Sequence, residues 1–249
     1  GLSEVKKLLR SQYKLIVAQE KRKAAGVNTK IEQNLNMVFA GNPGTGKTSI
    51  ARLVAEMLNS MGLLKVGQLI ETDRSSFVSD IPGETSKKTE EKFKEAIGGV
   101  LFIDEAYSLV PKDNSRDFGQ EAIATLIKAM EDYRDDLVVI FAGYTKEMQA
   151  FLDSNSGIVS RIGYTLEFED YTEDELVDIF KGMVKKAGFT VEDAAIEKLR
   201  TIINEYKDTK NFGNARFVRN VYEKTIVKHA SNTKNIKSKK KLKTITEED

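Results

Sequence analysis

One short stretch constrains the fold of this chain more than any other. Residues 41–48 read GNPGTGKT, a glycine-rich turn that ends in a lysine and a threonine. A short apolar run, Met37–Ala40, comes directly before it. Apolar residues at helical spacing follow it: Ile50, Leu53, Val54, Met57 and Leu58. We therefore predict a buried strand, a tight turn and a helix in succession, with the first N–H groups of the helix pointing into the turn.

The turn has the G-x-x-x-x-G-K-T spacing of a phosphate-binding loop. Gly44 and Gly46 let the backbone approach phosphates without an intervening Cβ atom. Lys47 can reach the β- and γ-phosphates of a nucleotide, and the Thr48 hydroxyl can ligate magnesium. A chance glycine-rich turn is the alternative, and the flanking strand and helix argue against it. The residues expected to contact the nucleotide are Asn42, Pro43, Gly44, Thr45, Gly46, Lys47, Thr48 and Ser49.

A second motif lies further along the chain, where the apolar run Val100–Ile103 ends in Asp104 and Glu105. A continuous apolar run predicts a strand of a parallel sheet covered on both faces. Acids at the carboxyl end of such a strand fall where open α/β sheets bind ligands. We predict Asp104 to be an outer-shell magnesium ligand and Glu105 the base that orients the attacking water. Two surface acids after a strand also occur by chance, but the phosphate loop upstream favours the functional interpretation.

Further strand patterns complete the expected sheet. They cover residues 68–72, 137–144 and 164–168, with helical patterns between them. This alternation predicts an α/β fold with a parallel, doubly wound, five-stranded sheet. Ahead of the sheet, residues 3–26 have a basic amphipathic pattern. We expect them to form a helix that packs on the core, and a partner-binding helix is the alternative.

After Asp170 the pattern changes to helices alone, at residues 172–188, 191–206 and 214–230. Thr172 and Glu175 have the spacing of a capping box at the first of these helices. This region is expected to be a separate helical lid domain. We therefore divide the chain into an α/β nucleotide-binding domain, a lid domain and a lysine-rich tail, at residues 1–169, 170–232 and 233–249.

The tail carries six lysines between residues 234 and 243. Such a run is typical of a solvated segment, and weak contact with nucleic acid or an acidic surface is the alternative. Overall the formal net charge is only +1, so no global field points to nucleic acid or to a membrane. We therefore expect no nucleic-acid partner for the chain as a whole.

Composition narrows the possible functions further. The chain has no cysteine and a single histidine, His229, which argues against disulfides, thiol chemistry and a zinc site. No apolar run approaches the roughly 20 residues of a membrane span. We expect a cytoplasmic protein without a membrane partner. Because the chain begins with Gly1 instead of Met, we also expect it to be an excised part of a longer protein.

The phosphate loop, the strand that ends in Asp104-Glu105 and the helical region after the sheet together resemble the AAA+ ATPases. Further stretches narrow the resemblance to one branch, which contains stage V sporulation protein K, the red-type rubisco activases and ATPases associated with type VII secretion. The stretches that carry it are residues 41–48, 98–107, 120–123, 135–139 and 142–144. The resemblance covers the chain from about Leu2 to Ala230 and does not specify a client.

This resemblance implies ATP as the substrate, Mg²⁺ as the cofactor and a homo-hexameric ring with ATP at subunit boundaries. It places Arg161 as an arginine finger for the γ-phosphate of the neighbouring subunit, and a salt-bridging surface arginine is the alternative. It places Arg216 as a sensor of the phosphates in its own subunit, with a surface charge as the alternative. Tyr144 takes the position of another sensor, where its phenol can hydrogen-bond a phosphate or water, or simply pack.

The resemblance fails at one loop, over residues 77–85. The family has an aromatic-aliphatic-glycine triplet in this central-pore loop, whereas this chain has Ile81, Pro82 and Gly83. An isoleucine offers an extended peptide less contact area than an aromatic ring, and proline stiffens the loop. Threading of a peptide is therefore the least supported part of the resemblance.

Three functions remain, in decreasing order of support. The first is ATP hydrolysis by a ring that remodels a protein client. The second is an ATP-dependent assembly or interaction module with slow hydrolysis and no threading. The third is a nucleic-acid ATPase that uses the lysine-rich tail.

Overall fold

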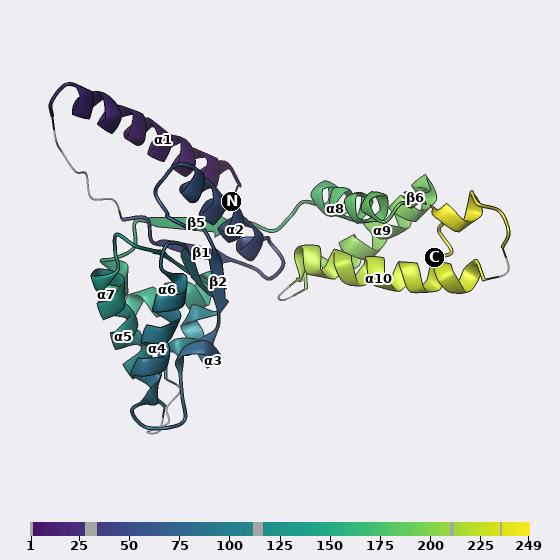
Figure 1. The fold of residues 1–249 in the computed structure, drawn as a ribbon. Coiled ribbons are helices and arrows are strands. Elements are labelled where there is room, and N and C mark those ends of the chain that lie inside the picture. The colour runs from purple at the N-terminus through teal and green to yellow at the C-terminus, as the bar shows by residue number, and fades with distance from the viewer. Residues whose placement is uncertain (1, 28–33, 112–116, 210–211, 235) are drawn as a thin grey trace. The chain divides into compact units, whose positions relative to one another are not determined.

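The computed structural model describes residues 2–27, 34–111, 117–209, 212–234 and 236–249 (Figure 1). By their contacts the residues form two compact units. The first contains residues 1–41 and 47–168, and the second contains residues 42–46 and 169–249. Five residues of the predicted phosphate loop therefore group with the helical end of the chain, while the strand before them and the helix after them group with the sheet.

A five-stranded parallel sheet is the centre of the first unit, as the sequence predicted. Its strands lie in the order β2-β3-β4-β1-β5 and all neighbouring pairs are parallel. The register sets the first residue of β1 level with the first residue of β5, Met37 with Tyr164. The strands are β1 Met37–Gly41, β2 Leu69–Thr72, β3 Val100–Ile103, β4 Val138–Gly143 and β5 Tyr164–Phe168.

Helices cover both faces of this sheet (Figure 1). Alternate strand residues point to opposite faces, so Val38 belongs to one core and Phe39 to the other. One face carries α1 Leu2–Ala24 and α2 Lys47–Ser60. The other carries α3 Arg74–Phe77, α4 Glu84–Ala96, η1 Ala106–Leu109, α5 Gly119–Asp132, α6 Thr145–Asp153 and α7 Ser156–Val159. Double coverage explains why β1, β3 and β4 are buried along their whole length.

The first helix, α1, packs on the core through its N-terminal half, as the amphipathic pattern predicted. Val5, Leu8 and Leu9 are buried in the same cluster as α2. Residues 20–27 are exposed, and Figure 1 shows this end of the helix extending past the sheet.

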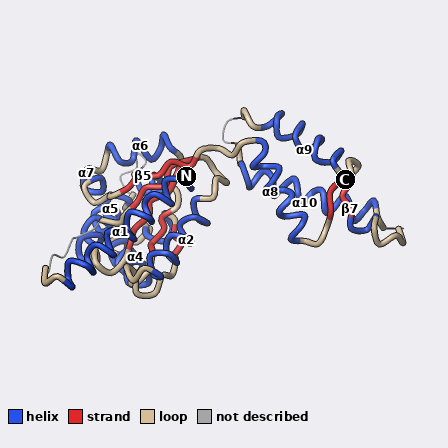
Figure 2. Tube along the Cα trace, turned by 90° about the horizontal axis from the view of Figure 1, so that it is seen from above, coloured by secondary structure: helices blue, strands red, loops and turns tan. Residues whose placement is uncertain are grey.

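The second unit is a small helical bundle (Figure 2). Its helices are α8 Glu173–Lys186, α9 Asp193–Tyr206 and α10 Asn214–Asn232. The predicted capping box is present, because Thr172 Oγ1 accepts from the backbone of Glu175 and the Glu175 carboxylate accepts from the backbone of Thr172. Apolar residues from all three helices form its core: Leu176, Phe180, Leu199, Ile203 and Val218.

The chain after α10 differs from the solvated tail that we expected over residues 233–249. After η2 Lys241–Lys243, strand β7 Thr244–Ile245 pairs in parallel with β6 Thr190–Val191, and Ile245 is buried in the core of the bundle. The carboxylate of Asp249 accepts a hydrogen bond from His229 at 2.9 Å. Residues 244–249 therefore belong to the helical unit. The lysines between residues 234 and 243 are exposed, as expected of a solvated run. The high lysine content of the segment hid the one buried apolar residue, Ile245, from the sequence analysis.

No helix among the described residues combines the length and the apolar character that crossing a membrane would require.

Candidate active site

The carboxyl edge of the sheet gathers the residues that the two motifs predicted. In a parallel sheet every strand ends at the same edge. The register sets Ala40 of β1 level with Gly143 of β4, and Phe141 of β4 level with Ile103 of β3. The chain segments that follow these strands therefore lie in one row along that edge: Asp104-Glu105 after β3, Tyr144 after β4 and the phosphate loop after β1.

The phosphate loop has the backbone that its glycines predicted. Gly44 and Gly46 have φ values of 72° and 91°, the left-handed region that favours glycine. Lys47 is the first residue of α2, and its Nζ atom donates a hydrogen bond to the Gly41 carbonyl at 2.8 Å. Thr48 follows in the first turn of the same helix. The start of α2 thus places an ammonium group and a hydroxyl directly after the loop.

The two acids after β3 are exposed at the edge of the sheet. Asp104 Oδ1 accepts a hydrogen bond from the Glu105 backbone N–H at 3.0 Å, and the Asp104 N–H donates to the Thr72 carbonyl at 2.8 Å. Glu105 has φ 47° and ψ 45°, a left-handed backbone that costs a non-glycine residue free energy. Strained residues of this kind cluster at functional sites, which agrees with the predicted catalytic role of Glu105.

An open cleft of about 610 Å³ lies beside these acids. Arg74, at the start of α3, helps to form its wall: Nη1 donates to the Ser108 carbonyl and Nη2 to Asp117 Oδ1, each at 2.6 Å. No motif pointed to Arg74, because its partners are brought to it only by the fold. The residues that line the cleft are Asp73, Arg74, Ser75, Val78, Asp80, Asp104, Glu105 and Ser108.

Tyr107 is a second residue that the sequence did not single out. Its ring stacks on that of Tyr144, with 5.9 Å between the centroids. Burial, reinforced by the nearby carboxylate of Glu105, raises the pKa of the Tyr107 hydroxyl above its usual range. Tyr144 therefore packs, which was one of its two predicted roles, and its contact with a phosphate or water stays a prediction.

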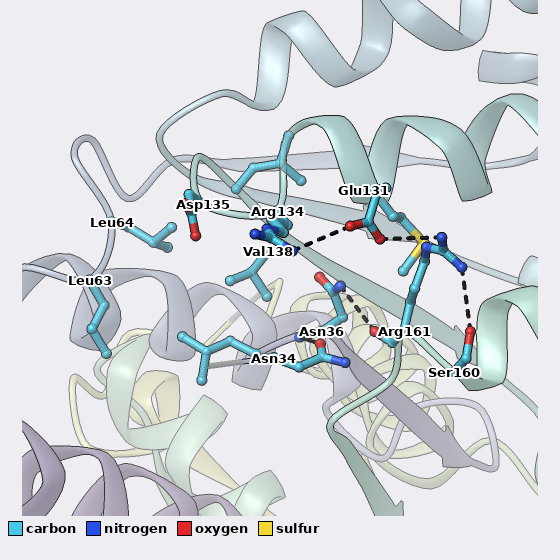
Figure 3. Close-up of a pocket in the computed structure, with 13 residues that line it drawn as sticks. Asn34, Asn36, Leu63, Leu64, Glu131, Arg134, Asp135, Val138, Ser160 and Arg161 are labelled. Carbon is cyan, nitrogen blue, oxygen red and sulfur yellow. Dashed lines mark hydrogen bonds and ion pairs between the residues drawn. The ribbon is translucent and has the colours of Figure 1, made fainter. Parts of the chain in front are cut away.

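Arg161 lies at the opposite edge of the sheet, the edge formed by the amino ends of the strands. It precedes β5, whose first residue is level with the first residue of β1. Its guanidinium contacts Glu131 Oε2 at 3.2 Å (Figure 3). It also donates from Nη1 to the Gly157 carbonyl at 3.0 Å. The ion pair with Glu131 is what the salt-bridge interpretation of Arg161 predicted, and the arginine-finger role stays a prediction.

Arg161 also borders a cavity of about 320 Å³ (Figure 3). Polar groups gather around it: Asn36 donates to the Arg161 carbonyl at 3.1 Å, and Arg134 donates to Glu131 at 3.3 Å. Glu131 therefore lies between two arginines. Other lining residues come from the segments that lead into β1 and β4, among them Asn34, Leu137 and Val138.

Arg216 lies in the first turn of α10, in the second unit. The start of that helix touches the phosphate loop, because the Ala215 N–H donates to the Gly44 carbonyl at 3.2 Å. The Arg216 side chain is exposed, and no hydrogen bond or ion pair of its guanidinium is found within the described part of the chain. A charged group near the loop is thus available to a bound phosphate.

The predicted pore loop is shorter than the sequence indicated. Residues 77–85 were expected to form this loop, but α3 extends to Phe77 and α4 begins at Glu84. The cause is local, because Asp73 and Ser76 form a capping box and Phe77 is buried. Ile81 lies in the remaining turn with 56% of its surface exposed.

The residues at the carboxyl edge fit a magnesium ion. The Thr48 hydroxyl and the Asp104 carboxylate are oxygen donors, which Mg²⁺ prefers together with phosphates and water. The described residues contain no group of three or more His, Cys, Asp or Glu side chains placed to hold a metal. An ion held mainly by nucleotide phosphates and water does not require such a group.

Two protein-family descriptions together match almost the whole chain after α1. Residues 37–170 match the ATPase family associated with various cellular activities (AAA), and residues 172–249 match the AAA lid domain. The lid match includes residues 244–249, in agreement with their packing on the helical bundle.

Several proteins are similar over most of their length. Stage V sporulation protein K of Bacillus subtilis is 41% identical over 91% of this chain and 70% of its own. A chloroplastic ribulose bisphosphate carboxylase/oxygenase activase of Cyanidioschyzon merolae is 44% identical over 92% of this chain and 75% of its own. Protein CbbX of Cereibacter sphaeroides is 41% identical over 93% and 74%.

Solved structures show the same fold at lower sequence identity. The FIGL-1 AAA domain in complex with ADP superposes with a TM-score of 0.62 at 21% identity, covering 99% of this chain and 78% of that one. The RuvB Holliday junction branch migration motor of Thermotoga maritima gives a TM-score of 0.60 at 22% identity, covering 99% and 66%.

Proposed function

The chain belongs to the AAA family of ATPases and is an ATP hydrolase, and we propose that it works in a ring and uses hydrolysis to remodel a protein client. The observation that carries this proposal is the separation of Lys47, Asp104 and Glu105 from Arg161 at opposite edges of one sheet. A complete hydrolytic site then needs two copies of the chain.

The residues at the carboxyl edge have distinct roles in this proposal. The phosphate loop and Lys47 bind the triphosphate, with N–H groups and the start of α2 supplying positive potential. Thr48, and Asp104 through a water shell, would hold Mg²⁺, which would supply positive charge beside the phosphates. Glu105 orients the attacking water and accepts its proton. Arg216 and Tyr144 contact the phosphates or the water from the same chain.

Arg161 acts on a neighbouring copy. The strand β1 alone spans about 13 Å, at about 3.3 Å per residue, and it separates the level of Arg161 from the loop. Its ion pair with Glu131 is no obstacle, since Glu131 is 52% exposed and a pair of this kind contributes only about 0–1 kcal/mol. Breaking this ion pair, so that the guanidinium can turn toward a γ-phosphate, therefore costs little free energy.

Mixing two inactive variants tests the shared site. Glu105→Gln removes the base but keeps Arg161, and Arg161→Ala removes the arginine but keeps the base. In mixed rings, some boundaries combine an intact Glu105 with an intact Arg161 from the next chain, so we expect ATP turnover to reappear on mixing. Turnover that stays at the level of the separate variants would contradict the placement of Arg161 in a neighbour's site.

An assembly module that does not thread its partner is the second candidate. It is favoured by Ile81, which is exposed and lies beside Pro82 where the family has aromatic and aliphatic residues. Ile81→Ala distinguishes the two functions in a client-remodelling assay, because a motor that grips its client with this loop should lose remodelling and keep ATP turnover. A module should keep both.

A further inference from the structure

The carbonyl groups of the phosphate loop have an arrangement that the family motif does not describe. Five consecutive carbonyls, from Gly41 to Thr45, each accept a hydrogen bond. Two of the donors belong to the loop and its helix: Lys47 Nζ bonds to Gly41 at 2.8 Å and Thr45 Oγ1 to Asn42 at 2.8 Å. The other three carbonyls are bonded by residues of the helical unit.

These three donors come from two separate segments of the second unit. Asn214 Nδ2 donates to the Pro43 carbonyl at 3.3 Å, and the Ala215 N–H donates to the Gly44 carbonyl at 3.2 Å. The Tyr171 hydroxyl donates to the Thr45 carbonyl at 3.1 Å. The contact is close at Gly46 too, where an added Cβ atom would lie 3.1 Å from that hydroxyl.

A polar cluster around the buried side chain of Asn214 holds two of these donors in place. Asn214 is completely buried, and its amide also donates to Asp170 at 2.7 Å while its oxygen accepts from the Tyr171 N–H at 2.9 Å. Asp170 in turn accepts from Asn42 in the loop at 3.0 Å. These mutual hydrogen bonds favour one geometry of the side chains.

The direction of the carbonyls matters for the chemistry of the loop. A loop binds phosphates by pointing its N–H groups inward, which turns its carbonyl groups outward. An outward carbonyl that loses its donor is destabilised, and rotation of its peptide would point the oxygen at the phosphates. Donors on the outer side therefore keep the inner side suited to an anion.

We propose that Tyr171 and Asn214 are positioning residues for nucleotide binding: they hold the outer carbonyls of the phosphate loop, and so keep its N–H groups directed at the phosphate chain. The inference rests on the proposed nucleotide site. Coupling of this kind is reciprocal, so a phosphate bound to the loop also strengthens the hold of the loop on the start of α10. This link between the triphosphate and the helical unit is separate from Arg216.

Tyr171→Phe removes one hydroxyl and nothing else. The matched control is Tyr222→Phe, because Tyr222 packs in the same hydrophobic cluster and its hydroxyl makes no hydrogen bond with a described residue. We measure the affinity for Mg–ADP by calorimetry, and the affinity for inorganic tripolyphosphate by competition with a fluorescent ADP. Tyr171→Phe should weaken both by about 3- to 10-fold, the effect of one hydrogen bond, while the control stays unchanged.

Using tripolyphosphate separates the two ways in which Tyr171 can influence binding. If Tyr171 acts through the loop, the phosphate-only ligand loses the same factor as ADP. If ADP binding weakens and tripolyphosphate binding does not, Tyr171 contacts the base or ribose and the proposal is wrong. The KM for ATP should rise by the same factor, with kcat at saturating ATP within about twofold of the unmodified chain.

Asn214→Gly gives an independent test, because the left-handed φ of 47° at this position suits glycine. It should weaken tripolyphosphate binding at least as much as Tyr171→Phe. Hydrogen exchange supplies the reciprocal measurement: ADP should protect the first amides of α10 in the unmodified chain and less in either variant. Equal protection in all three would overturn the proposal.

Lys47→Ala separates this inference from the proposed function. If Lys47→Ala leaves ADP binding intact, the nucleotide site itself is misplaced. If Lys47→Ala abolishes binding while Tyr171→Phe and Asn214→Gly bind tripolyphosphate normally, only the positioning role fails.

Discussion

The two edges of the parallel sheet differ in how their charged residues are held. At the carboxyl edge, Asp104 and Glu105 are exposed beside an open cleft, and Glu105 keeps a strained backbone. At the opposite edge, Arg161 is only 28% exposed and is tied to Glu131 and to the Gly157 carbonyl. In the proposed mechanism, the carboxyl edge binds the nucleotide of its own chain, whereas Arg161 at the opposite edge acts on the nucleotide of a neighbouring chain.

In the proposed mechanism, this difference is the reason why the charged residues of one chain do not make a complete site. The acids and Lys47 are placed by strands that end together, and so they meet in any single copy. Arg161 is placed just before β5, at the other end of the strands, and none of its hydrogen bonds or ion pairs within the described residues reaches the phosphate loop. Assembly of several copies is therefore part of the proposed catalytic mechanism. Substitutions at each of the two edges test this comparison.

The largest effect is expected at Arg161. Arg161→Ala should lower kcat by about 10³–10⁵-fold, because an arginine finger stabilises charge that develops in the transition state. Affinity for ATP in the same variant, measured by calorimetry, should be close to normal. Arg134→Ala is the matched control, since Arg134 borders the same cavity and also pairs with Glu131. Normal turnover by Arg161→Ala would leave Arg161 with only its ion pair.

A somewhat smaller loss is expected at the carboxyl edge. Glu105→Gln should lower kcat by about 10²–10⁴-fold, the usual contribution of a general base, and should leave ATP bound. Asp80→Asn is a suitable control, because its carboxylate lines the same cleft. If both variants lose the same activity, the loss does not depend on a general base at Glu105, and the assignment of Glu105 as the base is wrong.

The stacked tyrosines beside Glu105 predict a pH effect on stability. Because the pKa of Tyr107 is raised, its hydroxyl ionises more readily in the unfolded chain than in the folded one. The folded state then holds more protons above about pH 10, and its stability falls as the pH rises through that range. Tyr107→Phe should remove part of the loss in melting temperature between pH 9 and pH 11. Tyr13→Phe, at an exposed position, should not.

The smallest effect is expected at Glu131. Glu131→Gln removes one charge from an exposed ion pair worth at most about 1 kcal/mol, so kcat should rise by no more than about fivefold as Arg161 is released. Steady-state turnover at saturating ATP measures this. A fall of more than tenfold would mean that Glu131 holds Arg161 in its working position.

Much of the carboxyl edge could be predicted because its signals are local. The glycines of the loop, Lys47 and the apolar strand before Asp104 need only their neighbours to be recognised, and the sheet that they predicted is confirmed. Arg74 and Tyr107 could not be found in this way. Their partners, Asp117 and Tyr144, lie far along the chain and come close only when the sheet forms.

The end of the chain shows the same limit. The six lysines dominated the composition of the last segment, and the single apolar residue that anchors it, Ile245, carries little weight in any average. Pairing of β7 with β6 requires residues more than 50 positions apart, Val191 and Ile245. No hydrophobic periodicity within residues 244–249 indicates that β7 pairs with β6.

By itself the sequence indicated the five strands of the sheet, the three helices after it, the phosphate loop, the paired acids and the family. These features follow from spacing over a few residues, where backbone geometry and side-chain chemistry act together. Only the tertiary structure decided that Arg161 pairs with Glu131, and that Tyr171 and Asn214 bond to the outer carbonyls of the loop. Those contacts join distant segments, and their geometry is fixed by packing, which a linear pattern does not contain.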